Sequence, residues 1–124
     1  MRSSASVSAI VDFVQHTDAA LQAAFPGSRV VNFGHLGDGN LHYNLQAASG
    51  VSAQDFLDAH EEAVNRLVYD AVVACGGSIS AEHGIGALKR DELRERKSPV
   101  ALAMMRAIKQ ALDPKGTLNP GRVL

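Results

Sequence analysis

The stretch that decides the fold runs from residue 30 to residue 45 and reads VVNFGHLGDGNLHYNL. Two runs rich in β-branched and aromatic residues flank Asp38-Gly39, a dipeptide that tolerates the positive φ values of a type I′ turn. We therefore predict a β-hairpin in which Asp38 and Gly39 form the turn and residues at equal distances from this turn are paired across the two strands. His35 and His42 are then directly opposite each other, with Cβ atoms roughly 5 Å apart, and can bind one metal ion. A shift of the register by one residue would move one histidine to the other face.

Length and composition limit the class of protein. The 124 residues suffice for one domain with a modest core, and the net charge of −1 argues against a nucleic-acid partner, which usually binds a basic face. The single cysteine, Cys75, excludes an internal disulfide and favours a reducing compartment. We expect Cys75 to be a buried thiol. No apolar run reaches the ~20 residues of a membrane span, and no signal peptide is evident, so we expect a cytoplasmic protein.

Hydrophobic spacing predicts helices on both sides of the hairpin. The first covers about residues 5–24 and is stopped by Pro26-Gly27. The second begins after Ser52, which has Asp55 three residues later in a capping-box-like arrangement. It ends at Gly76-Gly77, where glycine permits a left-handed cap.

The remaining segments complete an α+β pattern. Ser78–Ala81 has strand character, and the charged segment from Lys89 to Lys97 is expected to be a short helix or an exposed turn. Ser98-Pro99 begins a last helix that ends at Asp113-Pro114 and is followed by an irregular tail. We predict a single α+β domain over residues 1–124, with a small, mainly antiparallel sheet of about three strands and helices packed on one face.

A metal site is the first chemical hypothesis. His35 and His42 supply two nitrogen ligands, and Glu82 is the best third candidate. Two histidines and one carboxylate leave coordination positions open, as catalytic zinc sites do, and the same set suits manganese, iron or cobalt. The alternative is a pair of histidines that only pack across the hairpin.

Glu82 and His83 stand together in a glycine-rich loop that continues Gly84-Ile85-Gly86. A carboxylate beside an imidazole can supply a metal ligand and a general base from one turn. Neighbours on a regular strand point to opposite sides, so both can serve one site only if the loop is irregular. The alternative is a surface turn without a chemical role.

Three motifs now occur in a fixed order: GHLGDGNLH from residue 34, AEHGIG from residue 81 and DPKGTLNPG from residue 113. Together they resemble the C-terminal region of FAD-linked oxidases of the vanillyl-alcohol-oxidase type. The branch they resemble contains D-lactate dehydrogenase, the glycolate oxidase flavoprotein subunit and D-2-hydroxyglutarate dehydrogenase. The resemblance extends from Arg29 to the end of the chain.

The resemblance implies roles for individual residues. His35, His42 and Glu82 correspond to the ligands of a divalent metal, zinc or manganese, and His83 corresponds to a base that also contacts the substrate. Asn44, on the same strand face as His42, matches a substrate-binding position. Asn119, in the tail motif, matches a position near the flavin and is therefore a cofactor-binding candidate.

The resemblance also implies what lies outside this chain. No glycine-rich diphosphate loop of a βαβ unit is present, so the N-terminal FAD domain that would hold most of the flavin is expected elsewhere. The chain resembles the C-terminal fragment of an enzyme that oxidises a small 2-hydroxy acid (D-lactate, glycolate or D-2-hydroxyglutarate) and passes electrons to an acceptor. Alone it should be inactive. A homodimer is compatible with this reading.

Two other classes of function stay open at this point. One is a stand-alone metal-binding module whose histidines fix the hairpin without redox chemistry. The other is a small metal-dependent hydrolase with Glu82 or His83 as base. The hydrolase is less favoured, because no serine, threonine or cysteine nucleophile has a convincing setting.

Overall fold

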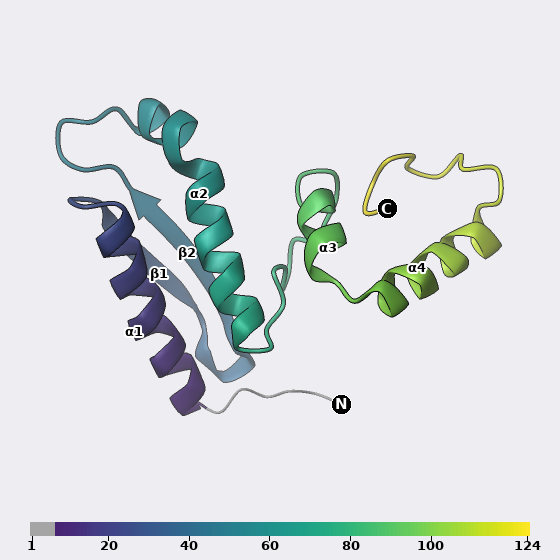
Figure 1. The fold of residues 1–124 in the computed structure, drawn as a ribbon, viewed down its shortest axis with the longest axis horizontal. Helices are drawn as coiled ribbons and strands as arrows, with labels where there is room; N and C mark the ends of the chain where they lie inside the picture. The colour runs from purple at the N-terminus through teal and green to yellow at the C-terminus, as the bar shows by residue number, and fades with distance from the viewer. Residues whose placement is uncertain (1–6) are drawn as a thin grey trace. The chain divides into compact units, whose positions relative to one another are not determined.

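The computed structural model describes residues 7–124 (Figure 1). Its contacts divide this part of the chain into two compact units, residues 7–79 and residues 80–124. Residues 5 and 6, the start of the first predicted helix, lie outside the described residues.

The first unit is a β-hairpin between two helices. Its elements, in order, are α1 (Val7–Ala24), β1 (Arg29–His35), the short 3₁₀ helix η1 (Leu36–Asp38), β2 (Asn40–Gln46) and α2 (Ala53–Ala74). The strands are antiparallel, and among the described residues they form the whole sheet. The α+β class is confirmed, but the expected third strand at Ser78–Ala81 is wrong, because that segment has no regular secondary structure.

The register of the hairpin differs from the prediction. Phe33 pairs with His42 and His35 pairs with Asn40, so the predicted pairing of His35 with His42 is wrong. The strands are joined by residues 36–39, which include η1, and not by a two-residue turn at Asp38-Gly39. Gly39 does take a positive φ of 69°. The shift amounts to two residues along one strand, so every side chain stays on the face that alternation predicted.

One face of the sheet is covered by the helices. Figure 1 shows α1 and α2 side by side over the strands, and α1 contacts β1 while α2 contacts β2. Tyr43 points to this face, where its ring meets Phe13 of α1 edge-on at a centroid distance of 5.8 Å. Asn32, its cross-strand partner, donates to the carboxylate of Asp18 in α1. The other face of the sheet is therefore the one turned away from α1.

The ends of α2 follow the sequence signals. The side chain of Ser52 accepts a hydrogen bond from the Asp55 N–H, and Gly76 has a φ of 72° in the left-handed cap. The N–H groups of Gly76 and Gly77 donate to the carbonyls of Val73 and Val72, which closes a Schellman motif. Cys75 is exposed in this cap, so the expectation of a buried thiol is wrong.

The second unit contains two helices and two irregular segments. α3 (Arg90–Arg96) is the short helix expected between Lys89 and Lys97, and α4 (Pro99–Leu112) begins after the N-cap Ser98, whose hydroxyl accepts from the Ala101 N–H. Leu93 of α3 and Leu102 of α4 are buried. We call residues 80–86 the Glu82–His83 loop and residues 113–124 the C-terminal tail. No helix in residues 7–124 is long and apolar enough to span a membrane.

Helix α4 presents an apolar stripe to solvent in this chain. Its members recur every four residues and therefore share one side of the helix. All are among the exposed large hydrophobic side chains: Val100, Met104, Ile108 and Leu112, of which Leu112 is 77% exposed. We call these four side chains the α4 stripe.

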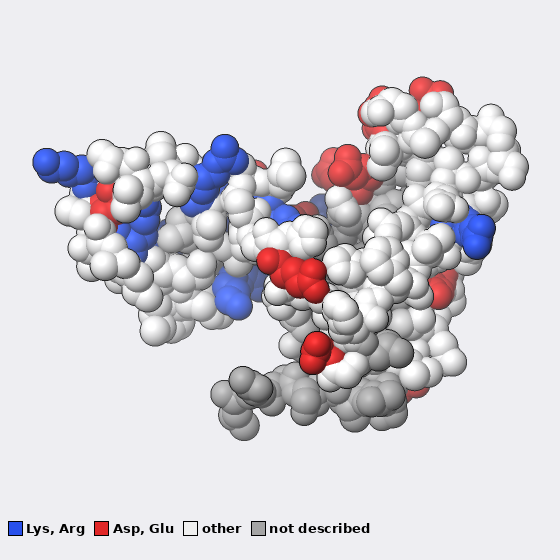
Figure 2. Space-filling model, turned by 180° about the vertical axis from the view of Figure 1, so that it is seen from behind, with Lys and Arg blue, Asp and Glu red and all other residues white. Residues whose placement is uncertain are grey.

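Charge is divided unevenly between the units. Residues 7–79 contain eight acidic and two basic side chains, whereas residues 80–124 contain five acidic and nine basic ones. Figure 2 shows most of the visible Lys and Arg side chains on the second unit. The near-neutral total therefore conceals an acidic unit followed by a basic one, and the basic unit favours anionic ligands.

Candidate functional site

The uncovered face of the hairpin carries three of the predicted site residues. Cross-strand pairs share a face, so His35, His42 and Asn44 all lie on the side opposite Tyr43. His35 and Asn44 are exposed and His42 is half-buried. The register makes His35 and His42 diagonal neighbours, a relation in which residues are roughly 7–8 Å apart. Two long imidazole side chains can still converge on one ion from that spacing.

The ring of His42 is held by a neighbour that sequence reasoning did not single out. Phe33, its cross-strand partner, stacks on it with a centroid distance of 5.0 Å and an interplanar angle of 13°. Stacking uses the face of the imidazole, whereas metal ligation uses an in-plane nitrogen lone pair. The stack is therefore compatible with ligation and restricts the orientation of the ring.

The third proposed ligand comes from the other unit of the chain. Glu82 lies in the Glu82–His83 loop, whereas His35 and His42 lie on the hairpin. Across residues 7–124, no three His, Cys, Asp or Glu side chains are gathered in a way that could hold a metal ion. What the structure brings together is the histidine pair, on one strand face.

The Glu82–His83 loop has the irregular backbone that shared use of its two side chains requires. Gly84 and Gly86 have φ values of 70° and 58°, and the Ser80 hydroxyl donates to the Gly84 carbonyl at 2.7 Å. The His83 Nε2 and Glu82 Oε2 atoms approach to 3.8 Å, which neighbours on a flat strand could not do. Both side chains are exposed. A carboxylate and an imidazole therefore point into one region of space.

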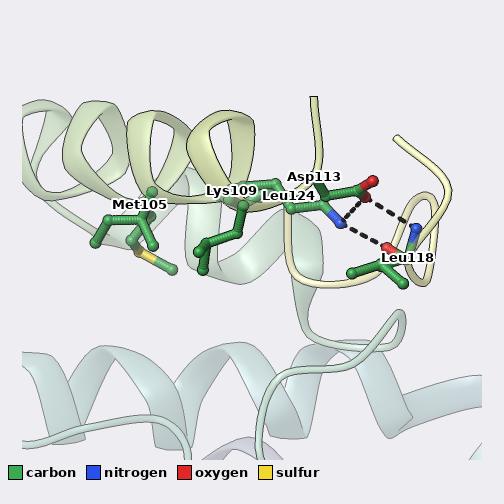
Figure 3. Close-up of a pocket in the computed structure, with 7 residues that line it drawn as sticks. Met105, Lys109, Asp113, Leu118 and Leu124 are labelled. Atoms are coloured by element: carbon green, nitrogen blue, oxygen red, sulfur yellow. Dashed lines mark hydrogen bonds and ion pairs between the residues drawn. The ribbon is translucent and has the colours of Figure 1, made fainter. Parts of the chain in front are cut away.

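The C-terminal tail is anchored by Asp113, which sequence analysis treated only as the end of a helix. Its carboxylate accepts from the Lys109 ammonium at 2.5 Å and from the N–H groups of Thr117 and Leu118, both at 2.9 Å. Lys109 also donates to the Leu118 carbonyl at 2.6 Å (Figure 3). The pattern Asp-Pro-Lys-Gly-Thr, four residues after a lysine on the same helix, was the available signal.

These contacts favour the ionised form of Asp113. The bond from Lys109, followed by the bond from the Leu118 N–H, holds the pKa of the Asp113 carboxyl well below its usual value. An ordinary aspartate titrates at about pH 4. A lowered pKa in the folded state adds stability above that pH, and this contribution is lost only as the solution becomes strongly acidic. The tail is therefore held throughout the neutral range.

Asn119 lies on the anchored tail. It is exposed, has a φ of 46°, and its carbonyl accepts from the Arg122 N–H at 3.2 Å. Asparagine tolerates this left-handed conformation better than most residues do. A shallow groove of ≈ 380 Å³ lies between α4 and the tail, but its lining is almost entirely apolar: Met105, Ile108, Lys109, Leu112, Asp113, Leu118 and Leu124. Asn119 does not line it.

Tyr43 supports the site from the covered side of the sheet. Burial, and then the negative charge of Asp18, raise the pKa of Tyr43 to about 12. The phenol therefore stays neutral at any physiological pH, wedged between the sheet and α1. Tyr43 lies between His42 and Asn44 in β2, so its ring contact with Phe13 packs this part of the strand against α1.

Comparison with known proteins places the chain. The family model described as FAD linked oxidases, C-terminal domain, matches residues 3–123. D-2-hydroxyglutarate dehydrogenase of Xanthomonas citri pv. viticola is 44% identical over 97% of this chain and 25% of its own length. The enzyme of the same name from Stutzerimonas stutzeri is 38% identical over 97% of this chain and 26% of its own length. The mitochondrial D-2-hydroxyglutarate dehydrogenase of Arabidopsis thaliana is 45% identical over 78% of this chain and 16% of its length.

The family match extends over nearly all of the sequence, including the hairpin, the Glu82–His83 loop and the tail. The chain spans about a quarter of the length of the first two of these relatives. The resemblance inferred from the three motifs is therefore confirmed. This chain belongs to the FAD linked oxidases and corresponds to their C-terminal domain.

Proposed function

We propose that the complete flavoprotein containing this chain oxidises a D-2-hydroxy acid to the 2-oxo acid, with D-2-hydroxyglutarate as the first candidate substrate. D-lactate and glycolate are the other candidates. The observation that carries the proposal is the single exposed strand face that holds His35, His42 and Asn44. The names of the relatives support the choice of substrate, and the excess of basic side chains in residues 80–124 suits a carboxylate ligand.

A divalent metal, zinc or manganese, forms part of the proposal. His35, His42 and Glu82 would hold it, because two imidazoles and one carboxylate are a donor set that leaves positions open for substrate oxygens. A bound cation lowers the pKa of a coordinated hydroxyl group and stabilises the alkoxide that forms. The histidine pair on one face and the restricted ring of His42 support this assignment.

The other residues of the site would handle the proton and the orientation of the substrate. An imidazole nitrogen of His83 would accept the proton of the 2-hydroxyl as the C–O bond becomes a carbonyl. The Asn44 side chain, on the metal-binding face, would donate to a substrate oxygen. FAD, when bound, supplies the acceptor for the α-hydrogen and its electron pair. We assign Asn119 as the residue of this chain that contacts the flavin. We also propose that the protein is located in the cytoplasm.

Substrate preference is the direct test. With an artificial electron acceptor, the complete flavoprotein should turn over D-2-hydroxyglutarate with a higher kcat/KM than D-lactate or glycolate. L-2-Hydroxyglutarate should not be oxidised, because a site that positions the α-hydrogen of the D-isomer for transfer cannot position that of the L-isomer. Steady-state kinetics with all four compounds checks this. A preparation with fully bound flavin that oxidises none of them would contradict the proposed function.

Metal binding can be measured without turnover. Calorimetry with Zn²⁺ and Mn²⁺ should show one ion per chain, and His35→Ala together with His42→Ala should weaken binding by at least about 10-fold. His16→Ala is the matched control, since His16 is an exposed histidine on α1 whose ring bonds the Asp12 carbonyl. Equal uptake by the double variant and the control would remove the metal from the proposal.

A further inference from the structure

Two hydrogen bonds hold the far end of the C-terminal tail, one to the Glu82–His83 loop and one to α3. The Val123 N–H donates to the Gly86 carbonyl at 2.8 Å, at the last residue of the loop. The guanidinium Nη1 of Arg90, at the start of α3, donates to the Gly121 carbonyl at 3.2 Å. Both partners on the tail are backbone carbonyl or amide groups, so the bonds fix the path of the chain.

The conformation of the tail shows that these contacts hold it under strain. Val123 has a φ of 67°, and the Leu124 N–H donates to the Arg122 carbonyl at 2.8 Å, which closes a γ-turn around it. A β-branched residue is rarely found in this region, and such turns are strained. A strained residue keeps its conformation only where its surroundings enforce it. Here the described surroundings are the bonds to Gly86 and, two residues earlier, to Arg90.

The near end of the tail is fixed independently. Asp113 is 6% exposed, and its carboxylate binds Lys109, Thr117 and Leu118. The segment from Asn119 to Arg122 therefore lies between two anchors, one at the end of α4 and one at the Glu82–His83 loop. Any displacement of the loop would be transmitted to this segment.

We propose that Arg90 is a positioning residue, which clasps the segment carrying Asn119 to the start of α3, the helix that follows the loop carrying His83. The inference rests on the proposed function for the roles of His83 and Asn119. Arg90 touches neither side chain in this structure; it acts through the Gly121 carbonyl and, with the Gly86–Val123 bond, makes the loop and the tail one body. The base and the flavin-facing residue are thereby kept at a fixed separation.

Amide hydrogen exchange on the 124-residue chain tests the clasp without any cofactor. Arg90→Gln should raise exchange of the amides in residues 119–124 and 83–86 by about 10-fold, since the charged donor to the Gly121 carbonyl is lost. Arg90→Lys, which keeps a charged donor, should restore part of the protection. Arg94→Gln is the control, because Arg94 lies on the same helix and bonds Asp91, as the Nε atom of Arg90 also does. Equal exchange in the Arg90→Gln and Arg94→Gln variants would overturn the clasp.

Flavin reduction in the complete flavoprotein tests whether the clasp positions the chemistry. Arg90→Gln should slow reduction by D-2-hydroxyglutarate by about 10-fold at saturating substrate, while KM stays unchanged and Arg94→Gln behaves as wild type. Increased exchange with an unchanged rate of reduction would overturn the positioning role. If the wild-type protein oxidises no 2-hydroxy acid, the proposed function has failed, and the exchange result alone still decides the clasp.

Discussion

His83→Gln is expected to lower the rate at which substrate reduces the flavin by 10²–10⁴-fold, roughly the contribution of a general base. Glutamine keeps hydrogen-bonding atoms near the position of the imidazole but accepts no proton at neutral pH. The His83 side chain is exposed, and its charged neighbour Glu82, at 3.8 Å, is exposed too. The substitution should therefore disturb the fold little. Stopped-flow bleaching of the flavin absorbance in the complete flavoprotein measures the rate directly.

Two comparisons separate a chemical role of His83 from a general defect. Dithionite, which needs no base, should reduce the flavin of wild type and variant equally fast. His16→Gln should leave the rate unchanged, because His16 lies on α1 and bonds the Asp12 carbonyl. A His83→Gln protein that is reduced by substrate at the wild-type rate would show that His83 is not the base.

Gly34→Ala is expected to destabilise the first unit by about 2–4 kcal/mol, at the upper end for a single substitution. A Cβ atom at this position would lie 2.0 Å from the backbone oxygen of Asn40, across the hairpin. Backbone cannot swing aside as a long side chain can, so the strands must separate or slide. Because His35 follows Gly34, such a change would also disturb the face for which we propose metal binding.

Urea unfolding monitored by tyrosine fluorescence measures the free energy of unfolding of the first unit selectively. The chain has two tyrosines and no tryptophan, and Tyr43 and Tyr69 both lie in residues 7–79. Gly37→Ala is the control, because a Cβ there meets nothing within 4 Å. The control should stay within about 0.5 kcal/mol of wild type. If both variants unfold at the same urea concentration, the close approach at Gly34 is not a constraint on stability.

The sequence sufficed to predict the hairpin, the limits of α2 and α4, and the shared face of the two histidines. Capping residues such as Ser52 and Ser98 acted locally, through bonds to the next turn of helix, so their effect was readable from neighbours. The face survived an error in register because that error was an even number of residues. Alternation depends only on parity.

The features that were predicted wrongly or missed depend on contacts between distant residues, or on local patterns that fit more than one structure. The dipeptide Asp38-Gly39 fits a tight turn, but η1 takes up Asp38 and leaves Gly39 alone in the left-handed region. The segment Ser78–Ala81 was predicted as a strand but has no regular secondary structure and does not join the sheet that the described residues form, because strand propensity alone does not make a strand. The clasp of Arg90 on Gly121 joins residues 31 positions apart, which no local pattern reveals.

The α4 stripe has a consequence for anyone who handles this chain in isolation. Four large apolar side chains on one side of a helix, with Leu112 77% exposed, form a surface that favours self-association in water. Raising the concentration of sulfate would strengthen that self-association, because sulfate is excluded from protein surfaces and favours the burial of apolar side chains. Precipitation of the purified domain in ammonium sulfate would therefore reflect this helix more than any loss of its folded structure.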